Sequence, residues 1–314
     1  PGELPVWRGG GPGRPSERGR ASGAVGHEVL NNELDVGQRD AWLAADYALD
    51  SKGRQALVQY LADQRAATGV VPTDRTIVIE RFHDEIGDLR LCILTPLGAR
   101  VHAPWAMALE AILSEQAGFE IVTTTSDDGI SIRFVQEAVN NPVADVLRWF
   151  PDPDTVEDLV LGQLAHTPLF AAMFRENAGR SLLLPKRGPG KRTPLWAQRR
   201  KGELLLAVAR EHPDFPLLLE TYRTCLDDIF DLPALVEILR AVHAGSIAVH
   251  EAFTERPSPM ARSLAFATTA TWLYETDAPL AERRSRELTL DVSRLRDLLG
   301  APDLAALLDP AIVQ

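Results

Sequence analysis

The chain has 314 residues, 45% of them hydrophobic and 25% charged, which is long and apolar enough for two or three structural domains with a buried core. Its formal net charge of −11 argues against a protein whose whole surface binds nucleic acid, because lysine and arginine carry phosphate binding. No stretch reaches the roughly 20 apolar residues of a membrane-spanning helix, and no signal peptide is recognisable. We therefore expect a cytoplasmic protein that has no membrane partner.

The two cysteines argue against a disulfide-rich or zinc-binding protein, and the first residues bear on whether the chain is complete. Cys92 and Cys225 lack CxxC spacing, so they predict small core residues and neither a disulfide framework nor a zinc site. The chain begins at Pro1 without an initiator methionine, and its first two dozen residues are rich in glycine, proline and arginine. We expect it to be part of a longer polypeptide.

The first 70 residues form two predicted segments. Residues 1–26 carry too many glycines for a helix, so Leu4 to Trp7 is predicted as the end of a strand whose partners lie upstream, and the segment taken alone as poorly ordered. Residues 27–70 have apolar positions at helical spacing, which predicts two helices with a break near 51–53.

A strand-rich block follows. Residues 76–81 and 89–95 predict an antiparallel pair, and residues 103–116 predict a helix with Pro104 in its first turn. Residues 120–125 and 130–134 predict a hairpin, because Asp128 and Gly129 form a tight-turn pair. Residues 247–253 alternate in polarity and predict a strand that returns to the same sheet.

Beyond residue 151 the pattern is helical. Five helix starts are predicted from capping residues and from prolines in the first turn: Thr155 with Asp158, Thr167 before Pro168, Thr193 before Pro194, Asp231 before Pro233, and Asp277 before Pro279. Leu218, Tyr222, Cys225 and Ile229 repeat at helical spacing and predict one buried stripe. The fold class is therefore α+β, with a small antiparallel sheet packed on a helical bundle in the C-terminal half.

The sequence contains no complete pattern of a catalytic, cofactor or metal site. Gly188 to Thr193 resembles a phosphate-binding loop, but Pro185 stands where a glycine is required and Arg192 separates the lysine from the hydroxyl. His83, Asp84 and Glu85 with His102 could form a metal or acid–base cluster, but consecutive turn residues face different ways and favour a solvated turn. We expect no catalytic residue, no cofactor site and no metal site in this chain.

Positive charge is concentrated at one place. Lys186, Arg187, Lys191 and Arg192 lie in a predicted loop, and Arg199, Arg200 and Lys201 follow on the next helix. Such a patch can hold phosphates through charge and counterion release. The alternative is an ordinary solvated loop and helix face.

The tryptophans offer a second route to nucleic-acid binding. Trp7 lies beside Arg8 and near Arg14, an arrangement that suits base stacking with contacts to adjacent phosphates. The alternative for Trp7 is a buried or interface side chain. Trp105, Trp196 and Trp272 are predicted to be packing anchors, and the sequence leaves Trp149 open.

Several strings together resemble the Lhr (large helicase-related) family of superfamily 2 helicases, in the DEAD/H-associated region that follows the motor domains and a winged helix. These strings are Leu4 to Gly9 with Gly13 to Pro15, Glu80 to Phe82, Gly98 to Trp105, Asp127 to Ile130, Phe174 to Ala178, Leu184 to Trp196, Pro213 to Pro216, Pro257 to Pro259, and Asp277 to Arg284. Their number and order carry the resemblance, which runs from about Leu4 to Pro310.

The resemblance implies domains, activity and partners. Residues 1–26 would be the truncated end of a β-barrel-like segment, 27–70 a helical connector, and 71–314 the DEAD/H-associated domain, with its sheet in 76–135 and helices in 155–314. The whole protein would be an ATP-dependent 3′-5′ helicase in DNA repair, acting on single-stranded DNA or RNA:DNA hybrids. ATP and magnesium would bind the RecA-like motor domains, outside this chain. Trp7 matches the family tryptophan that stacks on a base of the tracking strand.

Two other functions remain open from the sequence. The chain could be a structural module that packs on motor domains without touching nucleic acid, which the net charge of −11 favours. It could also be an independent enzyme, although no convergent set of titratable groups supports that function.

Overall fold

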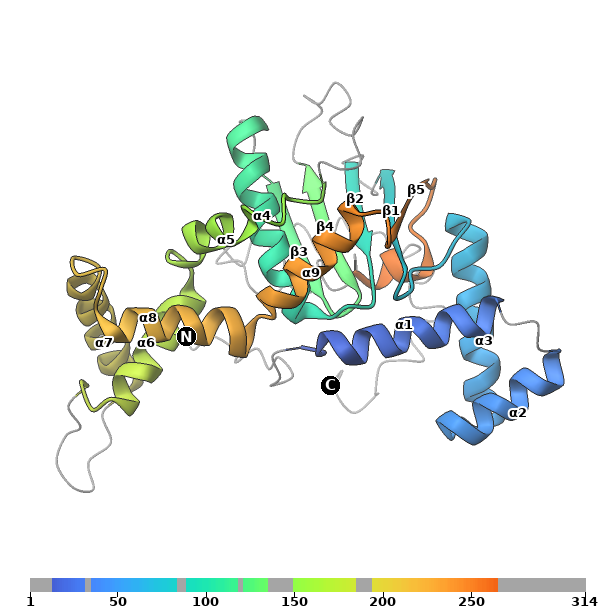
Figure 1. Ribbon diagram of the computed structural model, residues 1–314, viewed down its shortest axis with the longest axis horizontal. Coiled ribbons are helices and arrows are strands. Elements are labelled where there is room, and N and C mark those ends of the chain that lie inside the picture. Colours follow the sequence, from blue (N-terminus) through green and yellow to red (C-terminus); the bar gives the residue numbers. More distant parts are fainter. Residues whose placement is uncertain are drawn as a thin grey trace, which may run out of the picture. The chain divides into compact units, whose positions relative to one another are not determined.

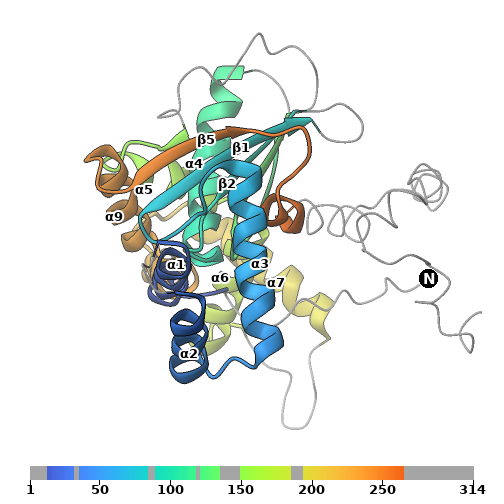
Figure 2. The ribbon, with the colours of Figure 1, turned by 90° about the vertical axis from the view of Figure 1, so that its right-hand side faces the viewer.

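The computed structural model describes residues 13–31, 35–83, 89–117, 121–134, 149–184 and 194–264. The described elements, drawn in Figures 1 and 2, are α1 (Ser16–Asn31), α2 (Val36–Tyr47), α3 (Ser51–Thr68), β1 (Thr76–His83), β2 (Leu89–Leu94), α4 (Ala99–Ala117), β3 (Ile121–Ser126), β4 (Gly129–Phe134), α5 (Val156–Leu164), α6 (Pro168–Arg180), α7 (Leu195–Ala209), α8 (Pro216–Arg223), the π-helix η2 (Thr224–Ile229), α9 (Leu232–His243) and β5 (Ala248–Phe253). The predicted α+β class is confirmed.

The described strands form one sheet in the order β3-β4-β2-β1-β5. The predicted pair β1–β2 and the hairpin β3–β4 are both antiparallel, and β5 returns to the sheet as expected. One expectation was wrong: β5 pairs with β1 in the parallel direction, so the sheet is mixed. The chain passes through the helices α5 to α9 between β4 and β5, which gives it the long connection that a parallel strand needs.

Alternation along the strands separates two buried faces. Ile77, Ile79, Leu91, Ile93, Ile130 and Ile132 point to one face, which α4, α5 and α9 cover. Val78, Phe82, Cys92 and Leu94 point to the other face, where Ala261 and Leu264 pack. Glu80 lies on this second face and is fully buried, but its carboxylate accepts hydrogen bonds from the Thr254 hydroxyl and from the Ser258 amide and hydroxyl. Both carboxylate oxygens therefore have hydrogen-bond partners despite their burial.

Helix α1 contradicts the expectation that residues 1–26 cannot be helical. A Cβ on Gly19 would lie 2.3 Å from the Pro96 carbonyl oxygen, and one on Gly23 would lie 2.4 Å from the Asp74 amide nitrogen. The glycines therefore allow α1 to lie directly on two loop backbones, and this packing outweighs their low helix propensity. The predicted strand at Leu4 to Trp7 lies outside the described residues.

The two helices predicted within residues 27–70 are present as α2 and α3. The break precedes Ser51, where the Asp50 carboxylate accepts a hydrogen bond from the Gly53 amide at 2.7 Å and caps α3. Val29, Leu43, Leu61 and Val71 form a small buried cluster that joins α1, α2 and α3. Helix α4 begins at Ala99, earlier than predicted, so Pro104 lies inside it rather than at its start.

Helices α6, α7 and α8 with η2 enclose a second core. Phe170, Phe174, Leu206, Leu218 and Cys225 are buried in it, which confirms the stripe predicted from residues 218 to 229. Thr167 and Asp231 cap α6 and α9 as predicted. Thr155 precedes α5 but makes no side-chain cap, because its hydroxyl donates back to the Asp152 carbonyl. The predicted starts at Thr193 and Asp277 lie outside the described residues.

Candidate nucleic-acid interface

Of the predicted nucleic-acid contacts, Arg14 and Arg199 are described. Trp7, Arg8, Lys186, Arg187, Lys191 and Arg192 lie outside the described residues. Their roles therefore remain predictions. The geometry around Arg14 shows how the chain that follows Trp7 is anchored.

Arg14 is held by the turn between β3 and β4. Its backbone amide donates to Asp127 Oδ1 at 2.7 Å, and its guanidinium donates to Asp128 Oδ1 and to the Pro96 carbonyl, both at 3.1 Å. The side chain is 25% exposed. Arg14 thus fixes residues 13–15 to the sheet, and any phosphate contact by its guanidinium would compete with Asp128.

Asp127 is the centre of this arrangement. The same Oδ1 atom also accepts from the Ala99 amide at 3.0 Å, so one carboxylate joins the start of α4 to the segment at Arg14. Burial by itself would raise the pKa of Asp127, but the two amides and the nearby Arg14 outweigh it and hold the pKa below its usual value. We call Arg14, Asp127 and Asp128 with the Ala99 amide the Arg14 clamp.

Gly98 makes the Arg14 clamp possible. Its φ is +98°, a conformation that glycine adopts without strain, and a Cβ there would lie 2.1 Å from the Arg14 carbonyl oxygen. The Arg14 backbone therefore passes over Gly98 at a distance that no side chain permits.

His102 lies behind the clamp and is fully buried. Its Nδ1 is 2.7 Å from the Ser126 carbonyl oxygen, the geometry of a protonated Nδ1 that donates. Burial lowers the pKa of His102 to about 4 despite that carbonyl and the nearby Asp127 and Asp128. His102 is therefore a neutral core residue at pH 7.

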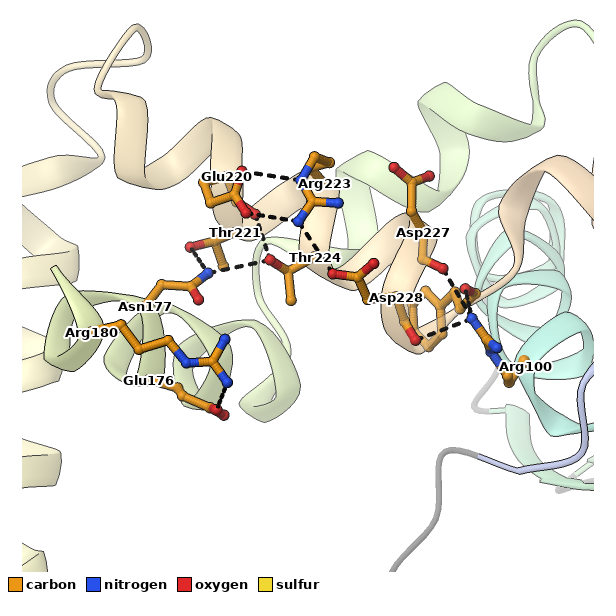
Figure 3. Close-up of polar contacts among 11 residues, drawn as sticks. Arg100, Glu176, Asn177, Arg180, Glu220, Thr221, Arg223, Thr224, Asp227 and Asp228 are labelled. Carbon is orange, nitrogen blue, oxygen red and sulfur yellow. Dashed lines mark hydrogen bonds and ion pairs between the residues drawn. The ribbon is translucent and has the colours of Figure 1, made fainter.

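Arg100, near the start of α4, joins that helix to the end of η2 (Figure 3). Its Nη2 donates to the carbonyls of Asp227, Asp228 and Phe230 at 2.9–3.2 Å, and its Nε donates to the Ile229 carbonyl at 3.2 Å. The last carbonyls of a helix lack intrahelical partners, so a cation there satisfies them. No local pattern around Arg100 indicates this role, because the carbonyls lie more than a hundred residues further along the chain.

A second contact, between α6 and the α8–η2 segment, contains a buried amide (Figure 3). Asn177 on α6 donates to the hydroxyl oxygens of Thr221 at 3.3 Å and Thr224 at 3.4 Å. These hydroxyls in turn donate to the carbonyls of Leu217 and Glu220. The network fixes the register between α6 and the α8–η2 segment.

Arg199 lies exposed on α7, beside a groove of about 590 Å³ between α6 and α7 that Arg175 and Arg210 also line. Trp196, in the preceding turn, is 68% exposed, so its prediction as a packing anchor was wrong. Trp105 and Trp149 are fully buried, which confirms the prediction for Trp105. Trp272 lies outside the described residues.

A metal or membrane site is not seen in the part of the chain that the structure describes. No group of three histidine, cysteine or acidic side chains there could hold a metal ion. His102 is buried and His83 is exposed, and Asp84 and Glu85 lie outside the described residues. None of the described helices is both long and apolar enough to cross a bilayer.

Residues 71–261 match the model of the family described as DEAD/H associated, which covers more than half of the chain. The chain belongs to this family. Three strings that carry the Lhr resemblance, Gly13 to Pro15, Gly98 to Trp105 and Asp127 to Ile130, meet in the Arg14 clamp of this DEAD/H-associated chain.

Curated relatives extend the likeness beyond the family model. The chain is 44% identical over its whole length to "Lhr helicase/ probable uracil glycosylase" of Mycolicibacterium smegmatis, and 42% identical over 99% of its length to "Lhr helicase/uracil glycosylase" of Escherichia coli. It spans about a fifth of the length of both relatives, 20% in each case. The predicted resemblance to Lhr helicases is confirmed.

A solved structure shares the fold. It is described as the structure of Mycobacterium smegmatis helicase Lhr bound to ssDNA and AMP-PNP, and it superposes with a TM-score of 0.73 at 42% sequence identity. The match covers 84% of this chain and 33% of that one.

Proposed function

We propose that this chain is the non-motor, DEAD/H-associated part of an Lhr-type ATP-dependent 3′-5′ DNA helicase, and that it contacts the single-stranded tracking strand. The observation that supports this most is the fold shared at 42% identity with an Lhr helicase described as bound to ssDNA. ATP and magnesium would be held by RecA-like motor domains elsewhere in the longer protein. The chain itself would hydrolyse no ATP. The whole helicase would act in DNA repair, on DNA or RNA:DNA hybrids.

Trp7 carries the proposed base contact. An aromatic face accepts any base, which suits a translocase that must move along any sequence. Gly13, six positions after Trp7, begins the segment that the Arg14 clamp fixes to the β3–β4 turn. The clamp would thereby limit where the preceding residues can reach, and Arg8 and the basic loop at 186–192 would add phosphate contacts.

Fluorescence anisotropy with a labelled oligothymidine across a salt series tests this function. Trp7→Ala should weaken binding between about fivefold and a hundredfold, the range that one stacked base contributes, and Trp7→Phe should restore most of it. Lys191→Ala with Arg192→Ala should lower the salt slope by about 1.4, at roughly 0.7 per phosphate contact on a single strand.

One other function has an observation in its favour. The net charge of −11 suits a module that packs on motor domains without touching nucleic acid. A folded chain that binds no oligothymidine even at low salt would support that module and reject the strand contact.

A further inference from the structure

We propose that the groove between α6 and α7 is a second contact for single-stranded nucleic acid, in which Arg175, Arg199 and Arg210 hold the phosphate backbone. This inference rests on the proposed function and adds a site on the helical bundle, on elements other than those of the Arg14 clamp. Figure 1 shows α6 and α7 side by side, in agreement with their packing in the second core.

The groove gathers cations from two helices. Arg175 comes from α6, Arg199 from the N-terminal half of α7, and Arg210 from the C-cap position directly after α7. His166 and Thr167 line the end where α6 begins, and Glu203 is the one acidic residue of the lining. Three arginines and one glutamate therefore line the groove, in a chain whose net charge is strongly negative.

Two of these arginines have unused donors. Among the described residues, neither the Arg175 nor the Arg199 guanidinium forms an ion pair or a hydrogen bond, whereas Arg14, Arg54, Arg100 and Arg223 are all engaged. Arg210 donates from Nη2 to the Ala165 carbonyl at 2.6 Å, which holds its guanidinium at the end of α5, just before α6. A guanidinium has five N–H donors, so Arg210 keeps capacity for an anion.

Gly202 positions Arg175. A Cβ at Gly202 would lie 3.0 Å from Arg175 Cγ and 3.1 Å from its Cβ, so α7 packs directly on the aliphatic stem of this arginine. Arg175 as a whole is half-buried and lines the groove. A long side chain held along its stem loses less freedom when its charged end binds.

The neighbouring tryptophan favours nucleic acid over an acidic peptide. Arginine forks match carboxylates and phosphates alike, so the cations by themselves do not decide. Trp196 lies three residues before Arg199, hence on an adjacent position of the helix surface, and it is 68% exposed. An exposed aromatic ring beside unpaired cations is the arrangement on which bases of a single strand stack while its phosphates are held.

The test compares two variants that lose the same charge. Arg175→Gln with Arg199→Gln removes two groove cations, and Arg65→Gln with Arg256→Gln removes two exposed cations from α3 and from the segment after β5. Binding of labelled oligothymidine is measured across a salt series. The groove variant should bind about tenfold more weakly at low salt and lose about 1.4 from the salt slope, and the control should change little. Trp196→Ala should also weaken binding, and Trp196→Phe should restore it.

The outcomes separate this site from the Trp7 contact. If Trp7→Ala weakens binding but the groove and control variants behave alike, the groove proposal is overturned and the proposed function stands. A folded parent chain that binds no oligothymidine overturns both. If the groove variant loses binding to polyglutamate but keeps binding to oligothymidine, the groove serves an acidic protein. Arg199→Gln alone repeats the test without touching the packed Arg175 stem.

Discussion

The backbone amide of Arg14 donates to Oδ1 of Asp127 at 2.7 Å, across 113 residues of sequence. The same oxygen accepts from the first amide of α4, so a single carboxylate connects the segment after Trp7, the β3–β4 turn and α4. Arg14 therefore has a structural part in the chain beyond the phosphate contact predicted for it, and its guanidinium is already bound to Asp128.

Asp127→Ala should lower the free energy of unfolding by about 2 kcal/mol, because two partly buried amides lose their acceptor. Urea denaturation measures this. Asp128→Ala is the matched control: it removes an exposed ion pair and should cost less than about 1 kcal/mol. Equal losses for the two variants would show that Asp127 does not anchor the segment. In binding assays, Asp127→Ala should also weaken oligothymidine affinity at temperatures where the variant is folded.

Two glycines should respond to alanine in opposite directions. Gly19→Ala should destabilise the chain by roughly 1–3 kcal/mol, because its Cβ would overlap the Pro96 carbonyl and push α1 from the loop. Gly162 lies inside α5 with open space around the Cβ position, so Gly162→Ala should stabilise by about 0.5–1 kcal/mol. Thermal melting of both variants tests the pair. A neutral Gly19→Ala would contradict the close packing of α1.

This contrast also explains what the sequence could predict. The β3–β4 hairpin and the caps at Thr167 and Asp231 follow from local rules that act within a few residues, and they were predicted correctly. Helix α1 was missed because the value of Gly19 and Gly23 depends on loops at Pro96 and Asp74, far along the chain. The glycine content of this segment therefore argued against a helix, whereas the packing of these glycines on the two loops favours one.

The candidate interface shows the same limit. Charge clustering led to Arg199, which the structure places beside a groove with Arg175 and Arg210. No sequence signal joined these three, because the packing of α6 on α7 brings them together. Trp196 was misassigned for a related reason: a tryptophan at a helix start is buried only if another element covers it, and among the described residues none does.

His102 should make stability depend on pH in a defined window. The pKa of His102 in the folded chain is about 4, below the ordinary 6.5. Between these pH values the imidazole is protonated in the unfolded chain but neutral in the folded chain. Stability should therefore fall as the pH drops from about 6.5 towards 4, by at most about 3 kcal/mol. Asp127, whose pKa is lowered, loses its contribution at more acidic pH. His102→Gln should be less stable at pH 7 yet flatter across this window in urea titrations, and an unchanged slope would reject the assignment.

Arg100→Lys should loosen the joint between α4 and η2 although it keeps the charge. The guanidinium donates hydrogen bonds from two nitrogen atoms to four consecutive carbonyls. The single ammonium nitrogen of lysine cannot reproduce this planar arrangement of donors. The loss should be about 2 kcal/mol, with faster amide exchange in residues 216–229 than in β1 and β2. Arg240→Lys is the control, since its ion pair with Asp154 is exposed and should contribute little. If exchange rises equally throughout the chain, Arg100 stabilises the whole fold and the joint has no separate mobility. Faster exchange confined to α8 and η2 would mean that this one side chain stabilises these two elements locally.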